Sequence, residues 1–244
     1  LLLFTSHKPM NLQQAKVLVT GGSSGIGFET ARLLIEKGAR VAICGRNAEN
    51  LQRAAAELGA LPIHADVSRE ADVVGMVQTV VETFGDYNVL INNAAFGYFA
   101  PLLDLDGEKM DALLATNVLG AMLAARESAK HFVTKQSGNI VNIASTAALN
   151  GSAGGTAYVA SKFALRGMTD CWRQELRRHN IRVMLVNPSE VQTDFVVNSG
   201  REGRPFNETK LRGSEIAHVI VSLLELPDVG FVPETSVWAT NPQG

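Results

Sequence analysis

Seven short runs of apolar residues, separated by helical patterns, follow one another along the whole chain. The runs hold apolar residues at nearly every position and do not alternate between apolar and polar ones. Strands have this character when helices cover both faces of a parallel sheet. The predicted strands are 16–20, 40–44, 61–65, 88–94, 138–145, 181–188 and 235–239. The pattern therefore predicts an α/β fold with a doubly wound parallel sheet of about seven strands. Its ligand site is expected at the carboxyl ends of the strands.

The length of the chain, 244 residues, suits a single domain of this kind. We expect residues 10–244 to form that domain, and we interpret residues 1–9 as an N-terminal extension or tag remnant. Segment 194–213 is long and polar and contains Gly and Pro. Such a segment is typical either of a substrate lid or of a surface insertion.

Composition excludes several classes of protein. The net charge is −2 and Lys and Arg form no long run, so the chain lacks the basic surface expected for binding nucleic acid. No apolar segment reaches about 18 residues, so we predict no transmembrane helix and no membrane partner. The five histidines are scattered, and we predict no metal site. The two cysteines, Cys44 and Cys171, are far apart in sequence. They are typical of core residues in a reducing compartment, so we predict a cytoplasmic location.

The segment TGGSSGIG (20–27) lies between the first predicted strand and the first predicted helix. Gly21 permits a tight turn, Gly25 lets a pyrophosphate approach the backbone, and Gly27 lets helix and strand pack closely. This spacing predicts a Rossmann-type dinucleotide site, completed by the other loop residues, Ser23, Ser24 and Ile26. The same letters match G-x-S-x-G, the nucleophile elbow of hydrolases, with Ser23 as nucleophile. A glycine-rich turn without a ligand is a further alternative.

At the end of the second predicted strand the chain reads Gly45-Arg46. An enzyme that binds the ribose 2′-hydroxyl of NAD places a carboxylate here, whereas a cation suits the 2′-phosphate of NADP. We therefore predict NADP(H) rather than NAD(H) as the cofactor. The alternative is that Arg46 is a solvated surface residue.

Four polar residues complete the pattern. Ser145 ends the fifth predicted strand, Tyr158 and Lys162 lie one helical turn apart, and Asn117 lies on the preceding helix. With the TGxxxGxG loop, Asp66 and NNAA (92–95), they resemble the short-chain dehydrogenase/reductase family, and its 3-oxoacyl-carrier-protein reductases in particular. The resemblance runs from about Lys16 to the end of the chain.

This resemblance implies a role for each of the four residues. Tyr158 is expected to act as the general acid or base. Lys162 is expected to lower the pKa of Tyr158 and to hold the ribose hydroxyls. Ser145 is expected to stabilise the substrate oxygen, and Asn117 to position a water molecule that links Lys162 to solvent.

The resemblance also implies further cofactor contacts. Asp66 and Val67 are expected to bind adenine; the structural alternative is that Asp66 caps a helix. The remaining expected contacts are Asn92, Ala94, Pro188, Val191 and Thr193. The chain departs from the family pattern at Ala95 and Ser189, where small residues replace glycine, and at Glu190, for which we predict no role.

We therefore predict an NADP(H)-dependent enzyme that transfers hydride between nicotinamide and a carbonyl or secondary alcohol. A 3-oxoacyl thioester, possibly bound to a carrier protein, is the leading substrate hypothesis. An NAD(H)-dependent alcohol dehydrogenase and a non-catalytic dinucleotide sensor are the alternatives. The resemblance implies a homodimer or homotetramer that pairs through helices 108–135 and 156–179. The expected substrate pocket is partly apolar, with Phe96, Tyr98, Phe99, Leu149, Phe195 and Phe206. The lid has a slight excess of basic residues, which are Arg201, Arg204, Lys210 and Arg212.

Overall fold

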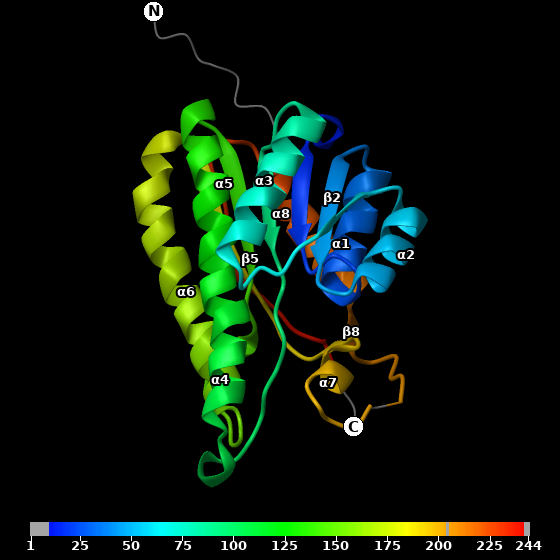
Figure 1. Cartoon of the computed structure of the whole chain (residues 1–244), viewed down its shortest axis with the longest axis vertical. Helices are drawn as coiled ribbons and strands as arrows, with labels where there is room; N and C mark the ends of the chain where they lie inside the picture. The colour runs from blue at the N-terminus through cyan, green and yellow to red at the C-terminus, as the bar shows by residue number, and fades with distance from the viewer. Residues whose placement is uncertain (1–9, 204, 242–244) are drawn as a thin grey trace, which may run out of the picture.

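A computed structural model of the chain describes residues 10–203 and 205–241. Its centre is a parallel sheet of seven strands in the order β3-β2-β1-β4-β5-β6-β9 (Figure 1). The strands are β1 (Lys16–Thr20), β2 (Arg40–Gly45), β3 (Leu61–His64), β4 (Val89–Asn92), β5 (Gly138–Ile143), β6 (Ile181–Pro188) and β9 (Glu234–Val237). The predicted doubly wound sheet is therefore confirmed. The predicted extension 1–9 and Arg204 lie outside the described residues.

Helices cover both faces of this sheet (Figure 1). They are α1 (Gly25–Glu36), α2 (Ala48–Leu58), α3 (Glu70–Phe84), α4 (Gly107–Leu114), α5 (Ala121–Lys135), α6 (Thr156–Leu176), α7 (Phe195–Asn198) and α8 (Gly213–Leu224). Successive strand residues point to opposite faces. Accordingly Val17 and Val19 of β1 pack in the core layer beneath α1, α2 and α8. Leu18 packs in the layer beneath α3 and α5. Both layers are buried, which is why the strands are nearly continuous apolar runs.

The helix predicted over 108–135 is interrupted. Helices α4 and α5 are joined by a π-helical turn, η3 (Ala115–Gly120), and Asn117 lies within it. Single π-helical turns of this kind occur frequently at functional sites. The turn changes which side chains face α6, and it leaves Asn117 only 2% exposed.

Segment 194–213 is anchored at both of its ends. Strand β7 (Val191–Gln192) pairs in parallel with β8 (Leu211–Arg212) and so brings the two ends together. The Gln192 side chain accepts a hydrogen bond from the Asn207 N–H (2.6 Å) and donates one to the Asn207 carbonyl (2.7 Å). The segment is therefore a closed loop that carries α7, and it lies below the carboxyl ends of the strands in Figure 1.

The two cysteines differ in burial. Cys44 is buried as expected, but the prediction that Cys171 is a core residue is wrong, because this side chain is exposed on α6. Within the described part of the chain no helix is long and apolar enough to cross a membrane. The same residues contain no cluster of three or more potential metal-binding side chains.

Candidate active site

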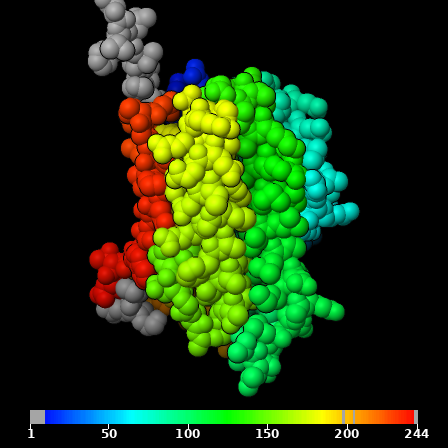
Figure 2. All heavy atoms as spheres, turned by 90° about the vertical axis from the view of Figure 1, so that its left-hand side faces the viewer, coloured from blue at the N-terminus to red at the C-terminus, as the bar shows by residue number. Residues whose placement is uncertain are grey.

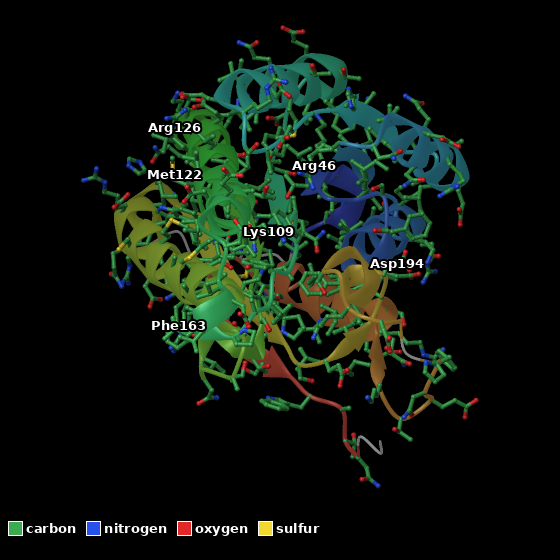
Figure 3. The ribbon with its side chains drawn as sticks, turned by 60° about the horizontal axis from the view of Figure 1, so that its bottom comes forward. Arg46, Lys109, Met122, Arg126, Phe163 and Asp194 are labelled. Atoms are coloured by element: carbon green, nitrogen blue, oxygen red, sulfur yellow. The ribbon has the colours of Figure 1, made fainter. Side chains whose placement is uncertain are left out.

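A cleft of about 1190 Å³ lies where the strands end. It extends from the glycine loop and Arg46, across the ends of β5 and β6, to α6 and the lid segment. Figure 3 shows Arg46 near the strands and Asp194 at the start of the lid segment. Most of the residues predicted to form the site line this cleft: Gly21, Ser23, Ser24, Gly25, Ile26, Arg46, Val67, Ala94, Ser145, Tyr158, Lys162, Pro188, Val191 and Thr193. The lining does not include Gly27, Asp66, Asn92 or Asn117.

The glycine loop has the geometry that its spacing predicts. Gly21 and Gly25 have φ of 65° and 55°, in the left-handed region where side chains are strained. A Cβ on Gly27 would lie 2.4 Å from the carbonyl oxygen of Gly21, so only glycine fits there. The cap residue Ser24 makes no side-chain hydrogen bond, so the first turn of α1 presents its N–H groups to the cleft. This arrangement fits a pyrophosphate.

Residues after β4 form hydrogen bonds with the start of this loop. The Thr20 hydroxyl accepts hydrogen bonds from the N–H groups of Asn93 (2.9 Å) and Ala94 (3.0 Å). The Asn93 amide donates to the carbonyls of Thr20 (3.0 Å) and Gly21 (3.1 Å). The neighbouring Asn92 instead donates to the Ala121 carbonyl in the buried layer. Asn93 is therefore the side chain of this pair that faces the glycine loop.

At the same end of the cleft Arg46 is joined by Asn47 and Asn50, two residues that were not predicted. Their position at the start of α2, directly after β2, is the signal that could have identified them. The carboxylate of Asp66 accepts two hydrogen bonds from Ser68, from its N–H (3.0 Å) and its hydroxyl (2.8 Å). Burial opposes ionisation of Asp66, but these bonds and the charge of Arg46 hold its pKa below the usual value.

Ser145, Tyr158 and Lys162 meet where β5 faces the start of α6. The Ser145 hydroxyl accepts a hydrogen bond from the Ala147 N–H (3.1 Å) and also bonds to the Tyr158 phenol. Lys162 is 3% exposed, and its Nζ lies 5.6 Å from the centre of the Tyr158 ring. Its ammonium donates to the Ile143 carbonyl (3.0 Å). An ammonium has three protons, so it retains donors that point into the cleft.

Asn117 lies behind this group and does not reach the cleft. Its amide nitrogen donates to the Phe96 carbonyl (2.9 Å) and to the Ser161 hydroxyl (3.1 Å). Its amide oxygen accepts from the Phe96 N–H (3.1 Å). The side chain thus fixes the segment after β4 against α6, and its neighbour Thr116 lines the cleft.

Burial controls the titration of the two central groups. It raises the pKa of Tyr158 to about 12, while the hydrogen bond to Ser145 and the charge of Arg201 oppose the rise. Burial also lowers the pKa of Lys162 to about 8. The direction for Tyr158 is opposite to the one expected from Lys162, because removing water from the phenolate outweighs the hydrogen bond with Ser145 and the charge of Arg201. The protein's own groups thus keep Tyr158 a neutral proton donor at pH 7.

Aromatic rings form the wall beside Tyr158. The ring centres of Phe99 and Phe195 lie 5.2 Å and 5.4 Å from that of Tyr158. The guanidinium of Arg201 lies 4.1 Å above the Phe99 ring. Trp238, just after β9, also lines the cleft and was not predicted to do so. Its position after the last strand, at the carboxyl edge of the sheet, is the signal that could have identified it.

Glu190, for which the sequence predicted no role, forms an ion pair with Lys210. The Glu190 carboxylate lies 3.3 Å from the Lys210 ammonium, whose side chain is only 9% exposed. The pair joins the residue before β7 to the residue before β8, and so it reinforces the base of the lid.

Comparisons with known proteins agree with this geometry. The family model for short chain dehydrogenases matches residues 15–203. The 3-oxoacyl-[acyl-carrier-protein] reductase of Homo sapiens is 36% identical over 219 residues, which is 86% of this chain and 90% of that protein.

Two solved structures resemble the fold closely. A 3-ketoacyl-(acyl-carrier-protein) reductase from Brucella melitensis, complexed with NADH, has a TM-score of 0.85 at 28% identity. The alignment covers 93% of this chain and 97% of that one. A short chain dehydrogenase from Burkholderia cenocepacia, in complex with NADP, has a TM-score of 0.83 at 28% identity and covers 94% and 98% of the two chains.

Proposed function

Because the chain belongs to the short chain dehydrogenase family, we propose that it is an NADP(H)-dependent oxidoreductase acting on a carbonyl or a secondary alcohol. The observation that carries the proposal is the convergence of Ser145, Tyr158 and Lys162 in one cleft with the glycine loop. A nucleotide bound along this cleft would supply the hydride. The loop and the first turn of α1 would hold its pyrophosphate.

The side chains divide the remaining work. Tyr158 donates its proton to the carbonyl oxygen in reduction and becomes a phenolate, and in oxidation this phenolate accepts the proton of the alcohol. The Ser145 hydroxyl accepts from the Ala147 N–H and keeps its own proton, which it can donate to the same oxygen. Lys162 would hold the ribose hydroxyls with the protons not used on Ile143. For Asn117 we retain the hypothesis of a water molecule that links Lys162 to solvent.

We assign NADP(H) rather than NAD(H) on the charge around Arg46. This guanidinium lines the cleft beside Asn47 and Asn50, and the carboxylates among the described lining residues, Glu190 and Asp194, belong to the lid end. Three hydrogen-bond donors at this place suit a phosphate better than a bare ribose hydroxyl. Arg46→Ala should therefore reduce the preference for NADPH over NADH, and an unchanged preference would contradict the assignment. The Asp66 and Val67 backbone remains our proposed adenine contact.

The leading substrate hypothesis is a 3-oxoacyl thioester, possibly bound to a carrier protein. Relatives with that name support it, and so does the aromatic wall of Phe99 and Phe195 beside Tyr158. We propose that segment 194–213 acts as the substrate lid, because α7 carries Phe195 into the cleft.

The mechanism is tested by Tyr158→Phe. One general acid–base group accounts for roughly 10²–10⁴ in turnover, so kcat should fall by that factor while cofactor binding persists. The matched control is Tyr98→Phe, because the Tyr98 hydroxyl accepts a hydrogen bond from the Asp106 N–H (2.8 Å) and does not line the cleft. Wild-type turnover in Tyr158→Phe would end the proposal. Cofactor binding without any hydride transfer would favour the dinucleotide sensor.

We also propose that two copies pair through α5 and α6. These helices run side by side on one face of the molecule (Figure 2). Between them lies a largely apolar groove of about 480 Å³ that contains Met122, Val133 and Trp172. Figure 3 shows Met122 and Phe163 on this outer side, and Phe163 is 43% exposed. A homodimer or homotetramer in a cytoplasmic location is the state we expect, and sedimentation would measure its size.

A further inference from the structure

Arg201 brings a positive charge into the part of the cleft where the lid meets Tyr158. Its guanidinium lies 4.1 Å above the ring of Phe99, and that ring centre lies 5.2 Å from the centre of the Tyr158 ring. The Arg201 N–H donates to the Val196 carbonyl (3.2 Å), and its Nε donates to the Ser199 hydroxyl (3.1 Å). These contacts hold the charge one aromatic ring away from the phenol.

The Arg201 guanidinium has hydrogen-bond donors that are not used within the described part of the protein. Among the described residues no carboxylate forms an ion pair with Arg201, and its two terminal nitrogens have no acceptor. Two carboxylates also line the cleft. Glu190 is paired with Lys210, and Asp194 is exposed to solvent. A guanidinium with two free parallel donors matches a carboxylate in geometry and charge.

The field of Arg201 already acts at the catalytic group. Burial raises the pKa of Tyr158, and the charge of Arg201 opposes that rise. The same field favours a negative charge placed in the cleft next to the guanidinium. No other cation is present among the described residues that line this end of the cleft, apart from the buried Lys162.

We propose that Arg201 binds a carboxylate on the substrate, so that the preferred substrate is an oxo acid whose carbonyl and carboxylate are a few bonds apart. This inference rests on the proposed carbonyl reduction and replaces the thioester by an oxo acid as the preferred substrate class. A carrier-bound thioester fits less well, because its nearest anion is at the end of a long arm. The guanidinium is separated from Tyr158 only by the ring of Phe99.

The test compares an acid with its neutral ester. Initial rates of NADPH oxidation would be measured with 3-oxobutanoate and with its methyl ester, for the wild-type protein and for Arg201→Gln. Hydrogen bonds to a charged group contribute enough for Arg201→Gln to lose about 10- to 100-fold in kcat/KM for the acid, mainly through KM. The ester should change by less than about threefold. Arg201→Lys should restore part of the loss.

Arg212→Gln is the matched control. This arginine also belongs to the lid and lies over an aromatic ring, 5.6 Å from the centre of Phe206, but it does not line the cleft. It should alter the rates with neither substrate. If Arg201→Gln affected acid and ester equally, or neither of them, the inference would be overturned.

Calorimetric titration of 3-oxobutanoate separates this inference from the proposed function. If no carbonyl compound were reduced, the proposed function would fail. Binding of 3-oxobutanoate to the wild-type protein and to Arg212→Gln, but not to Arg201→Gln, would still support the carboxylate site. Absence of binding to the wild-type protein, or equal binding to all three, would refute that site.

Discussion

Gly27→Ala tests the contact between α1 and the glycine loop. The added Cβ would lie 2.4 Å from the Gly21 carbonyl oxygen and 2.6 Å from the Asn93 amide nitrogen. Both distances are far shorter than an ordinary van der Waals contact. The first neighbour is backbone and the second is bonded to that same carbonyl, so neither can move independently. The helix must therefore shift away from β1, or the loop must deform.

The magnitude follows from two opposing terms. Overpacking of a filled site costs about 1–3 kcal/mol, and contacts this short place the cost at the upper end. Replacing Gly by Ala inside a helix stabilises the folded state by up to about 1 kcal/mol, because Ala has the higher helix propensity. The net loss in the free energy of unfolding is then about 2 kcal/mol. In a chain of this size that corresponds to a fall in Tm of roughly 4–8 °C.

Gly75→Ala is the control with the opposite sign. Gly75 lies within α3, and an added Cβ would meet nothing within 4 Å. Only the helix propensity changes, so the variant should gain about 0.8–1 kcal/mol and roughly 2–4 °C in Tm.

The assay is thermal and urea unfolding of both variants, each with and without NADP⁺. Wild-type protein at about 100 times the Kd of the cofactor should gain about 2.7 kcal/mol. Gly75→Ala should keep that gain, whereas Gly27→Ala should lose most of it because the Gly21 carbonyl and Asn93 are displaced. If Gly27→Ala were as stable as Gly75→Ala and bound cofactor normally, the packing argument for this glycine would be wrong.

Three further outcomes are expected. Lys162→Met removes a buried ammonium whose folded pKa, about 8, is below its unfolded value, so the wild-type protein gains stability as the pH rises through this range. The free energies of unfolding of wild type and Lys162→Met would be measured in urea between pH 7 and 9.5. Over this range the wild-type protein should gain about 2 kcal/mol relative to the variant. A constant difference would contradict the burial argument. Glu190→Gln removes the carboxylate that lies 3.3 Å from the Lys210 ammonium. The free energy of local opening of the lid should fall by about 1 kcal/mol, so proteolysis within 194–210 should become several-fold faster. An unchanged rate of digestion would show that the pair does not anchor the lid. Ser145→Ala removes one donor to the substrate oxygen and should lower kcat by roughly 10²–10³ without affecting the dinucleotide-induced shift in Tm; normal kcat would exclude this role.

Local patterns were sufficient to predict most of the sheet and the loop. The core strands are apolar at nearly every position because both faces are covered, and this property is visible in the sequence of β1 or β6 without any structure. Gly21 and Gly25 could be recognised because a left-handed φ at a tight turn admits few other residues. Tyr158 and Lys162 could be paired because one helical turn separates them.

Side-chain direction was harder to predict. Asn92 and Asn93 are adjacent, and alternation along the strand decides that Asn92 enters the buried layer while Asn93 reaches the glycine loop. The sequence allowed Asp66 either to bind adenine or to cap a helix, and in the structure its carboxylate accepts two hydrogen bonds from Ser68. The π-helical turn around Asn117 depends on how α5 packs against α6, which a periodicity of 3.6 residues does not reveal.

The sequence by itself determined the fold class, the order of the elements and the edge of the sheet where the site forms, because each rests on contacts between near neighbours in the chain. Only the tertiary structure decided the charge states and the substrate end of the cleft. Burial, which depends on every surrounding element, raises the pKa of Tyr158 and lowers that of Lys162. Arg201 and Phe99 come from segments about a hundred residues apart. The lid brings Arg201 to Phe99, and the pairing of β7 with β8 holds the two ends of the lid together.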